Sequence, residues 1–228
     1  MNTKSEIAAN IARITREIDG RARLLAATKT VPAEVINFAA GCGITLIGEN
    51  RVNELLEKYE LLDRSRLEIH FIGALQTNKV KYIADKVSMI HSVDRLPLAE
   101  EIERRCAKLG KTMDVLVEVN VAGEESKSGV RPEETAEFCE KIAAFPHLRL
   151  RGLMCVPPKC DDPAENKKYF CKMRKIFIDI SHKKIDNSNI DTLSLGMSGD
   201  YLAAIECGST MVRIGSAIFG ERDYTKII

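Results

Sequence analysis

One lysine stands where an amine nucleophile could work. Lys29 directly follows the apolar run Leu24–Thr28, which has the length and composition of a buried strand. At a strand end its amine would be partly shielded from water, and burial disfavours the ammonium form, which cannot attack a carbonyl carbon. The alternative is an ordinary surface lysine. Spacing alone favours that alternative, because 34 of the 228 residues are lysine or arginine.

Two loops rich in small residues near the C-terminus could hold an anion. The first contains Met197 and leads into a predicted helix, and the second follows the last apolar run. Small residues let backbone N–H groups approach an anion closely, and a helix N-terminus adds partial positive charge. The loops therefore predict a phosphate cup formed by Ser198, Gly199, Gly215 and Ser216. Two ordinary glycine turns are the alternative.

Other polar residues near predicted strand ends have ordinary structural explanations. Asn50 could hydrogen-bond a ligand or cap the helix that follows it, and as a pattern capping is favoured. His70 and His91 lie in apolar runs, where a histidine is more often packed and hydrogen-bonded than catalytic. The two histidines are therefore predicted to be structural.

The elements that must position these residues alternate along the chain. Eight short apolar runs predict strands, at Leu24–Thr28, Ile44–Ile47, Glu68–Ile72, Val87–His91, Asp114–Val121, Leu148–Leu153, Thr192–Leu195 and Met211–Ile214. Helical patterns lie between them, near residues 33–40, 51–62, 77–85, 95–109, 132–144, 164–182 and 200–206. A further helix precedes the first strand, where Thr3 and Glu6 have the form of a capping box.

This alternation predicts an α/β fold, a single (β/α)8 TIM barrel over residues 1–228 with an extra N-terminal helix. A doubly wound open sheet is the runner-up, because alternation alone does not prove that the sheet closes. In a barrel of this kind the active site lies at the carboxyl ends of the strands, and phosphate binds after strands seven and eight. The barrel therefore favours the phosphate cup over two ordinary turns.

Composition excludes several classes of protein. The formal net charge is +1 and neither end of the chain is an acidic or basic tail, so nothing indicates a nucleic-acid partner. No apolar run approaches the ~20 residues of a membrane span, and the N-terminus lacks a signal-peptide pattern, so we expect a cytoplasmic protein. The seven cysteines are scattered and none forms a C-x-x-C pair. We expect them to be reduced thiols that hold no metal.

Seven segments together carry a resemblance to a known family. They are ATKT (27–30), GENR (48–51), HFIG with LQTNK (70–79), VN through GEESKSG (119–129), RGLM (151–154), LSLGMSGD (193–200) and GSTMVRIGSAIFG (208–220). In this order they resemble the pyridoxal phosphate homeostasis proteins, also called proline synthase co-transcribed homologues. Ala74 and Val156 depart from the family pattern, and neither is a predicted ligand-binding residue.

The resemblance implies a barrel like the N-terminal domain of alanine racemase, with pyridoxal 5′-phosphate (PLP) as cofactor. It implies a Schiff base between PLP and Lys29, phosphate in the predicted cup, and Arg213 facing the pyridine nitrogen. The predicted cofactor-binding residues are Lys29, Asn50, Met197, Ser198, Gly199, Arg213, Gly215 and Ser216. No residue is assigned a catalytic role and no metal is expected.

These implications favour a binding protein over an enzyme. Arginine can only donate hydrogen bonds, whereas many PLP enzymes place a carboxylate on the ring nitrogen. Tyr201 is a candidate second base, but packing is its favoured role. We expect a monomer that stores PLP reversibly within the cell and passes it to PLP-dependent apoenzymes. The alternatives are a PLP-dependent amino-acid racemase of low activity and a barrel that binds another phosphorylated metabolite.

Overall fold

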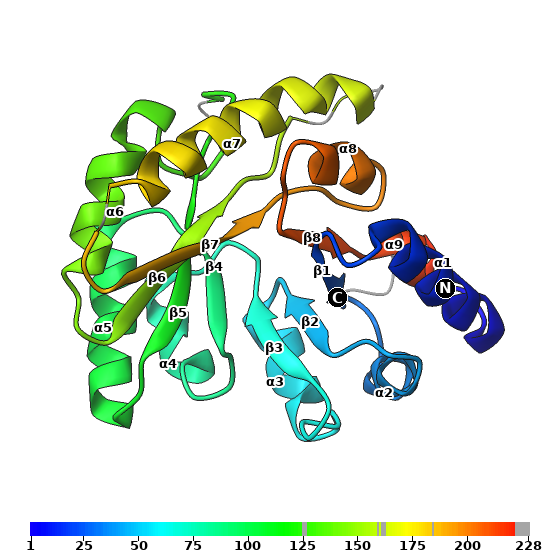
Figure 1. Ribbon diagram of the computed structural model, residues 1–228. Coiled ribbons are helices and arrows are strands. Elements are labelled where there is room, and N and C mark those ends of the chain that lie inside the picture. Colours follow the sequence, from blue (N-terminus) through cyan, green and yellow to red (C-terminus); the bar gives the residue numbers. More distant parts are fainter. Residues whose placement is uncertain (125–126, 159, 161–162, 184, 222–228) are drawn as a thin grey trace.

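A computed structural model of the chain describes residues 1–221 except 125–126, 159, 161–162 and 184. Eight parallel strands pair in chain order and close into a barrel, with β1 against β8. This closure confirms the (β/α)8 barrel and excludes the doubly wound open sheet. Figure 1 shows the strands at the centre and the helices around them.

The strands are β1 (Arg23–Ala27), β2 (Leu46–Glu49), β3 (Glu68–Phe71), β4 (Met89–Val93), β5 (Met113–Glu118), β6 (Leu148–Met154), β7 (Ser188–Ser194) and β8 (Met211–Ile214). The α-helices are α1 (Lys4–Ile18), α2 (Ala33–Gly41), α3 (Val52–Tyr59), α4 (Val80–Ile83), α5 (Leu96–Leu109), α6 (Thr135–Ala143), α7 (Lys167–Ser181), α8 (Tyr201–Glu206) and α9 (Ser216–Phe219). Short 3-10 helices precede three of them, η1 (Thr77–Lys79), η2 (Pro132–Glu134) and η3 (Pro163–Asn166).

The predicted elements are present, and the differences lie at their ends. β7 begins at Ser188, before the predicted start at Thr192. The prediction began too late because the first residues of β7 are polar and partly exposed, so they show no apolar run. β5 ends at Glu118, before the predicted end at Val121. The short helix α9 was not predicted, since four residues are too few to show helical periodicity.

The extra N-terminal helix forms for the reasons that its sequence suggests. Thr3 and Glu6 make both hydrogen bonds of the capping box, and Asp19 ends the helix in the left-handed conformation. The apolar face of α1 is fully buried. Figure 1 shows α1 beside α9, so the first and last of the described helices lie side by side in the outer layer.

Strand parity decides which side chains face the barrel interior. Successive residues of a strand point to opposite faces. In β1, Ala26 belongs to the large core between strands and helices, whereas Leu25 and Ala27 belong to a small cluster with Met211 of β8. A second small cluster, from β4, β5 and β6, fills another part of the interior. Lys29 continues the parity of Leu25 and Ala27 and therefore extends from the inward row.

Among the described residues, no helix combines the length and the apolar character that crossing a membrane requires.

Candidate ligand-binding site at the barrel mouth

A cavity of about 510 Å³ opens at the carboxyl ends of the strands. Its volume lies within the ~300–1,000 Å³ range of small-molecule sites. Seven of the predicted cofactor-binding residues line it, Lys29, Asn50, Met197, Ser198, Arg213, Gly215 and Ser216. Gly199 is exposed and does not line it. Four lining residues were not predicted, Ala27, Ile72, Val156 and Glu221, although the inward parity of Ala27 is a signal that could have found it.

Lys29 is half-buried, as its predicted place at a strand end requires, and the backbone on both sides of it is tied to α3. Lys58 Nζ donates to the carbonyl oxygen of Thr28 at 3.0 Å, and the Thr30 N–H donates to Glu54 Oε2 at 2.7 Å. Thr30 has a φ of 64°. A β-branched residue rarely adopts this left-handed conformation, and such strain persists only where surrounding contacts hold it. Lys58 and Glu54 are those contacts.

A buried carboxylate, that of Glu49, links the end of β1 to α3. Glu49 is 1% exposed and points outward from β2, where it accepts from Lys58 Nζ at 2.7 Å and from Thr28 Oγ1 at 2.6 Å. Burial raises the pKa of Glu49, and the charge of Lys58 opposes that rise. The two ionic partners stabilise each other away from water and fix the end of β1. No local pattern marks Glu49 as a positioning residue, because its partners come from α3 and the end of β1.

Asn50 faces the cavity and does not cap α3. The capping position belongs to Arg51, which makes no side-chain capping bond, so the favoured capping role for Asn50 is wrong. Asn50 Oδ1 is buried and has no hydrogen-bond partner among the described residues. An unsatisfied buried acceptor costs about 1–3 kcal/mol. A donor on a ligand would remove that cost.

Gly73 makes the position of Asn50 possible. A Cβ at Gly73 would lie 2.2 Å from the backbone oxygen of Asn50, which is far inside van der Waals contact. The loop after β3 therefore packs directly on the Asn50 backbone. Any other residue at this position would displace Asn50 from the cavity wall.

The predicted phosphate cup joins the loops after β7 and β8. Ser198 Oγ accepts from the N–H of Gly215 at 3.1 Å and from the N–H of Ala217 at 3.2 Å. Both lone pairs of this hydroxyl are then used, so its own hydrogen remains to donate. The cup therefore offers the Ser198 hydroxyl as a donor to an anion, while the N–H groups of Gly215 and Ala217 already donate to that hydroxyl.

Asp200 shapes the loop that carries Ser198. Its carboxylate accepts from the N–H of Met197 at 2.6 Å and from Asn166 Nδ2 at 2.8 Å. At the start of the loop Gly196 has a φ of 86°, and a Cβ there would lie 2.6 Å from the Cβ of Ala204. The tight turn therefore needs glycine, and Asp200 holds it closed.

Arg213 is buried inside the barrel without a carboxylate partner among the described residues. Nη1 donates to the backbone oxygen and the hydroxyl of Ser194 at 2.8 and 2.7 Å, and Nη2 donates to the Cys155 oxygen at 2.9 Å. Burial lowers the pKa of the Arg213 guanidinium. Within the described part of the chain, the Nε–H has no acceptor, so a donor remains at this wall of the cavity.

Behind Arg213 lies a polar network in which Ser194, His91 and His70 are buried and Glu68 is exposed. His70 Nε2 lies 2.9 Å from Glu68 Oε1, His70 Nδ1 lies 2.9 Å from His91 Nε2, and His91 Nδ1 lies 3.4 Å from Ser194 Oγ. Because the Ser194 hydroxyl accepts from Arg213, its hydrogen points to His91. Each histidine then carries its proton on Nε2, and every link donates toward Glu68.

Both histidines have a structural role, as predicted. Burial lowers the pKa of His70, and it lowers that of His91 well below the usual value, so both rings are neutral at pH 7. Their connection to Arg213 through Ser194 was not predicted. The connection depends on strands that are far apart in the chain.

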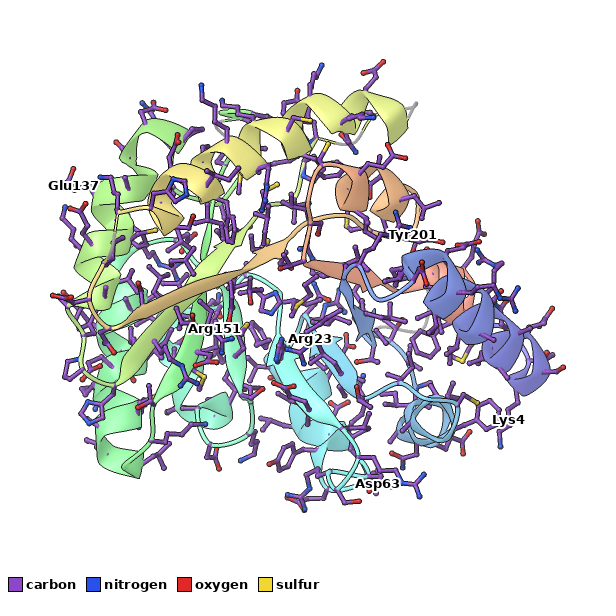
Figure 2. The ribbon with its side chains drawn as sticks, in the orientation of Figure 1. Lys4, Arg23, Asp63, Glu137, Arg151 and Tyr201 are labelled. Carbon is purple, nitrogen blue, oxygen red and sulfur yellow. The ribbon has the colours of Figure 1, made fainter. Side chains whose placement is uncertain are left out.

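Tyr201, the first residue of α8, packs against α1, in agreement with its favoured role as a packing residue. Its hydroxyl donates to the carboxylate of Glu17 on α1, and Figure 2 shows Tyr201 at this junction. It does not line the cavity. In the described ranges, His, Cys, Asp and Glu side chains form no group of three that could hold a metal ion.

Comparison with known proteins places these features in context. The model of the alanine racemase N-terminal domain family matches residues 3–223. A pyridoxal phosphate homeostasis protein of Aquifex aeolicus is 49% identical over 203 residues, covering 89% of this chain and 88% of its own. PipY of Synechococcus elongatus, solved with PLP bound, is 30% identical with a TM-score of 0.86, covering 94% of this chain and all of PipY.

The fold also extends to full-length enzymes. An alanine racemase of Clostridium difficile 630 superposes with a TM-score of 0.76 at 17% identity, covering 97% of this chain and 58% of the racemase. At that identity the likeness concerns the barrel alone.

Proposed function

Because this chain belongs to the alanine racemase N-terminal domain family, and to the pyridoxal phosphate homeostasis proteins within it, we propose that it binds PLP reversibly and serves PLP homeostasis inside the cell. One observation carries the proposal. A single cavity collects an amine at Lys29, an anion cup at Ser198 and Gly215, and a buried guanidinium at Arg213. These are the groups that an aldehyde, a phosphate and a pyridine nitrogen need.

The residues present fit PLP. When bound, PLP supplies an aldehyde that a primary amine attacks and an aromatic ring that accepts electron density. The Lys29 amine would hold the aldehyde carbon covalently, with loss of one water, and hydrolysis or exchange with another amine would release it. Ser198, Gly215 and Ser216 would hold the phosphate, and Asn50 Oδ1 would accept from a donor on the ligand.

Arg213 supports a carrier over a catalyst. A guanidinium stays protonated and only donates, so beside the ring nitrogen it would leave that nitrogen unprotonated. An unprotonated ring stabilises negative charge poorly, and the cofactor would then be held with little activation. The names of the relatives, which describe homeostasis proteins, support the same reading. Lys29 would serve as a reversible anchor.

The central test uses the covalent bond to Lys29. Purified protein is mixed with PLP, its visible absorbance is recorded, and borohydride followed by peptide mapping locates the trapped cofactor. We expect Lys29→Ala to lose all trapped cofactor while keeping the melting temperature of the wild type, and exposed Lys81→Ala on α4 to behave as wild type. Equal trapping at another lysine of Lys29→Ala would contradict the assignment.

Storage and delivery need a second test. Loaded protein is mixed with a PLP-dependent apoenzyme while a phosphatase destroys free PLP, and recovery of apoenzyme activity reports transfer. Light scattering of the loaded protein checks the proposed monomer. Sustained racemisation of any single L-amino acid by the loaded protein would overturn the carrier role in favour of a racemase.

A further inference from the structure

Two cysteines lie together on the outer layer of the barrel, away from the cavity. Cys171 is exposed on α7, and Cys207 is buried at the end of α8, which packs beside α7 (Figure 1). Their sulfur atoms are 2.9 Å apart, although 36 positions separate them in the sequence. A disulfide bond would need the sulfurs only about 0.9 Å closer.

The two helices hold this pair in place. Lys167 Nζ on α7 contacts Glu206 Oε2 on α8 at 3.0 Å, and the Cys207 thiol donates to the Lys167 backbone oxygen at 3.7 Å. Lys167 is four positions before Cys171 and shares its helix face. The thiols therefore meet between two packed helices.

The charge around Cys171 indicates the kind of oxidant that would reach it. α7 carries five basic residues and one acidic residue, Asp179. Lys167, Lys168 and Lys175 lie three or four positions from Cys171 and surround it on the helix surface. Positive charge attracts an anionic partner to this surface. A small disulfide that bears carboxylates, such as oxidised glutathione, has this chemistry.

We propose that Cys171 and Cys207 form a reversible disulfide by exchange with anionic small-molecule disulfides. The Cys171 thiolate attacks one sulfur of the small disulfide, which releases one small thiolate and leaves a mixed disulfide. Cys207 then attacks the Cys171 sulfur and expels the second small thiolate, which takes up the Cys207 proton. Two protein thiols are oxidised and one small disulfide is reduced to two thiols.

The order of attack follows from burial. Burial and the neighbouring Cys171 raise the pKa of Cys207 to about 11, so Cys207 is protonated near neutral pH. Exposed Cys171 is the thiol that a small disulfide reaches first. Cys207 reacts second, when the mixed disulfide already stands beside it.

The bond would affect the candidate cofactor site. Asn166, the residue before α7, donates a hydrogen bond to the Asp200 carboxylate. Asp200 in turn shapes the loop that precedes α8 and carries Ser198. A covalent link between α7 and α8 would restrain that loop. If the protein binds PLP as proposed, the oxidised protein should release PLP more slowly than the reduced protein, by about twofold or more. The reason is that a preorganised site loses less order on binding.

The test begins with fully reduced protein titrated with oxidised glutathione, followed by alkylation and mass spectrometry. We expect wild type to lose two hydrogen masses, to yield a peptide pair joining Cys171 to Cys207, and to recover on reduction. The melting temperature should rise by about 5 °C or more in the oxidised form. Cys207→Ser should stop with glutathione on Cys171, and Cys42→Ser, outside the pair, should match wild type.

Two results would overturn the site: wild type that keeps glutathione on Cys171, or wild type in which both thiols remain fully alkylated. Release of PLP at equal rates from oxidised and reduced protein would overturn the effect on the cup alone. A reduced wild type and a reduced Cys171→Ser variant that both fail to bind PLP would count against the proposed function instead. The mapped peptide pair does not depend on PLP.

Discussion

The polar groups at the two ends of the barrel interior differ in how many of their hydrogen bonds are made within the protein. At the floor, where the strands begin, Glu68, His70 and His91 match donors to acceptors in one direction, and Arg23 and Ser88 also donate to Glu68. At the mouth, Asn50 Oδ1 has no partner in the described part of the chain, and Arg213 has no carboxylate there. The floor satisfies its polar groups internally, and the mouth retains capacity for a ligand.

The contrast shows what distinguishes a structural polar network from a binding site. The polar network of Glu68, His70, His91 and Ser194 shares the barrel interior with the apolar cluster around Leu25 and Met211 and the apolar cluster around Met89 and Leu116. Its last member, Ser194, accepts from Arg213, so the satisfied end supports the unsatisfied one. The polar groups with unused hydrogen-bonding capacity that also line the cavity are those available to a ligand.

The largest expected effect comes from breaking the satisfied end. His91→Leu would leave buried His70 Nδ1 without a donor and the Ser194 hydrogen without an acceptor, although Ser194 would still accept from Arg213. These losses should cost about 3 kcal/mol in the free energy of unfolding. Ser92→Ala is the matched control, because Ser92 follows His91 in β4 and its buried Oγ already lacks a hydrogen-bond partner among the described residues. Urea unfolding of both variants measures the difference. An equal loss in the two would refute the contrast between matched and unmatched groups.

The next largest effect concerns the pH dependence of stability, which should differ between two carboxylates. A hydrogen bond from His70 holds the pKa of Glu68 well below its usual range, whereas burial raises that of Glu118, at the mouth end of β5, to about 7 from 4.5. Folded Glu118 retains its proton longer than unfolded Glu118, so its contribution to stability is lost as pH rises from about 4.5 to about 7. The loss should be about 2 kcal/mol after allowance for partial exposure.

Glu118→Gln tests this directly, because the amide cannot ionise. We expect the variant to gain stability relative to wild type at pH 8 and to gain none at pH 4.5, as measured by urea unfolding at both values. A constant difference across pH would show that Glu118 ionises as an ordinary carboxylate.

A smaller effect separates binding from stability at the mouth. Asn50→Ala removes an acceptor that has no partner, so the free energy of unfolding should stay level or rise by up to about 1 kcal/mol. The same change should weaken PLP binding about tenfold if the ligand donates to Oδ1. Thermal unfolding and fluorescence titration give the two numbers. A loss of stability with unchanged PLP affinity would show that Asn50 has a structural role, like the residues of the polar network, and does not bind the ligand.

The smallest effect concerns the strained residue after Lys29. Thr30→Gly should raise the free energy of unfolding by about 0.5 kcal/mol, because relief of left-handed strain slightly exceeds the entropy that glycine loses. It should also slow trapping of PLP at Lys29, since the backbone is held less firmly. Asp19→Gly is the control, because Asp19 is also left-handed and aspartate tolerates that conformation. Faster trapping in Thr30→Gly would contradict a positioning role.

Local pattern predicted the eight strands, the α-helices other than the short α9, and the loops of the cup. Apolar runs and helical periodicity predicted the barrel, and small residues after the last strands predicted the loops of the cup. Pattern failed at Asn50, where a capping residue and a cavity-lining residue look alike in sequence. It also failed at Glu49, whose partner Lys58 is chosen by packing of α3 against β2. These roles depend on which face of an element meets which neighbour.

The sequence by itself determined which residues end strands and which loops can admit an anion, because period, residue size and backbone freedom are local properties. Only the tertiary structure decided what those residues meet. Pairing of β1 with β8 sets Leu25 opposite Arg213 and brings Lys29 to the cavity that Ser198 and Gly215 line. Packing of α7 on α8 brings Cys171 to Cys207 in the same way. The first of these contacts arises from barrel closure and the second from helix packing, and both join residues too far apart along the chain for a local pattern to record them.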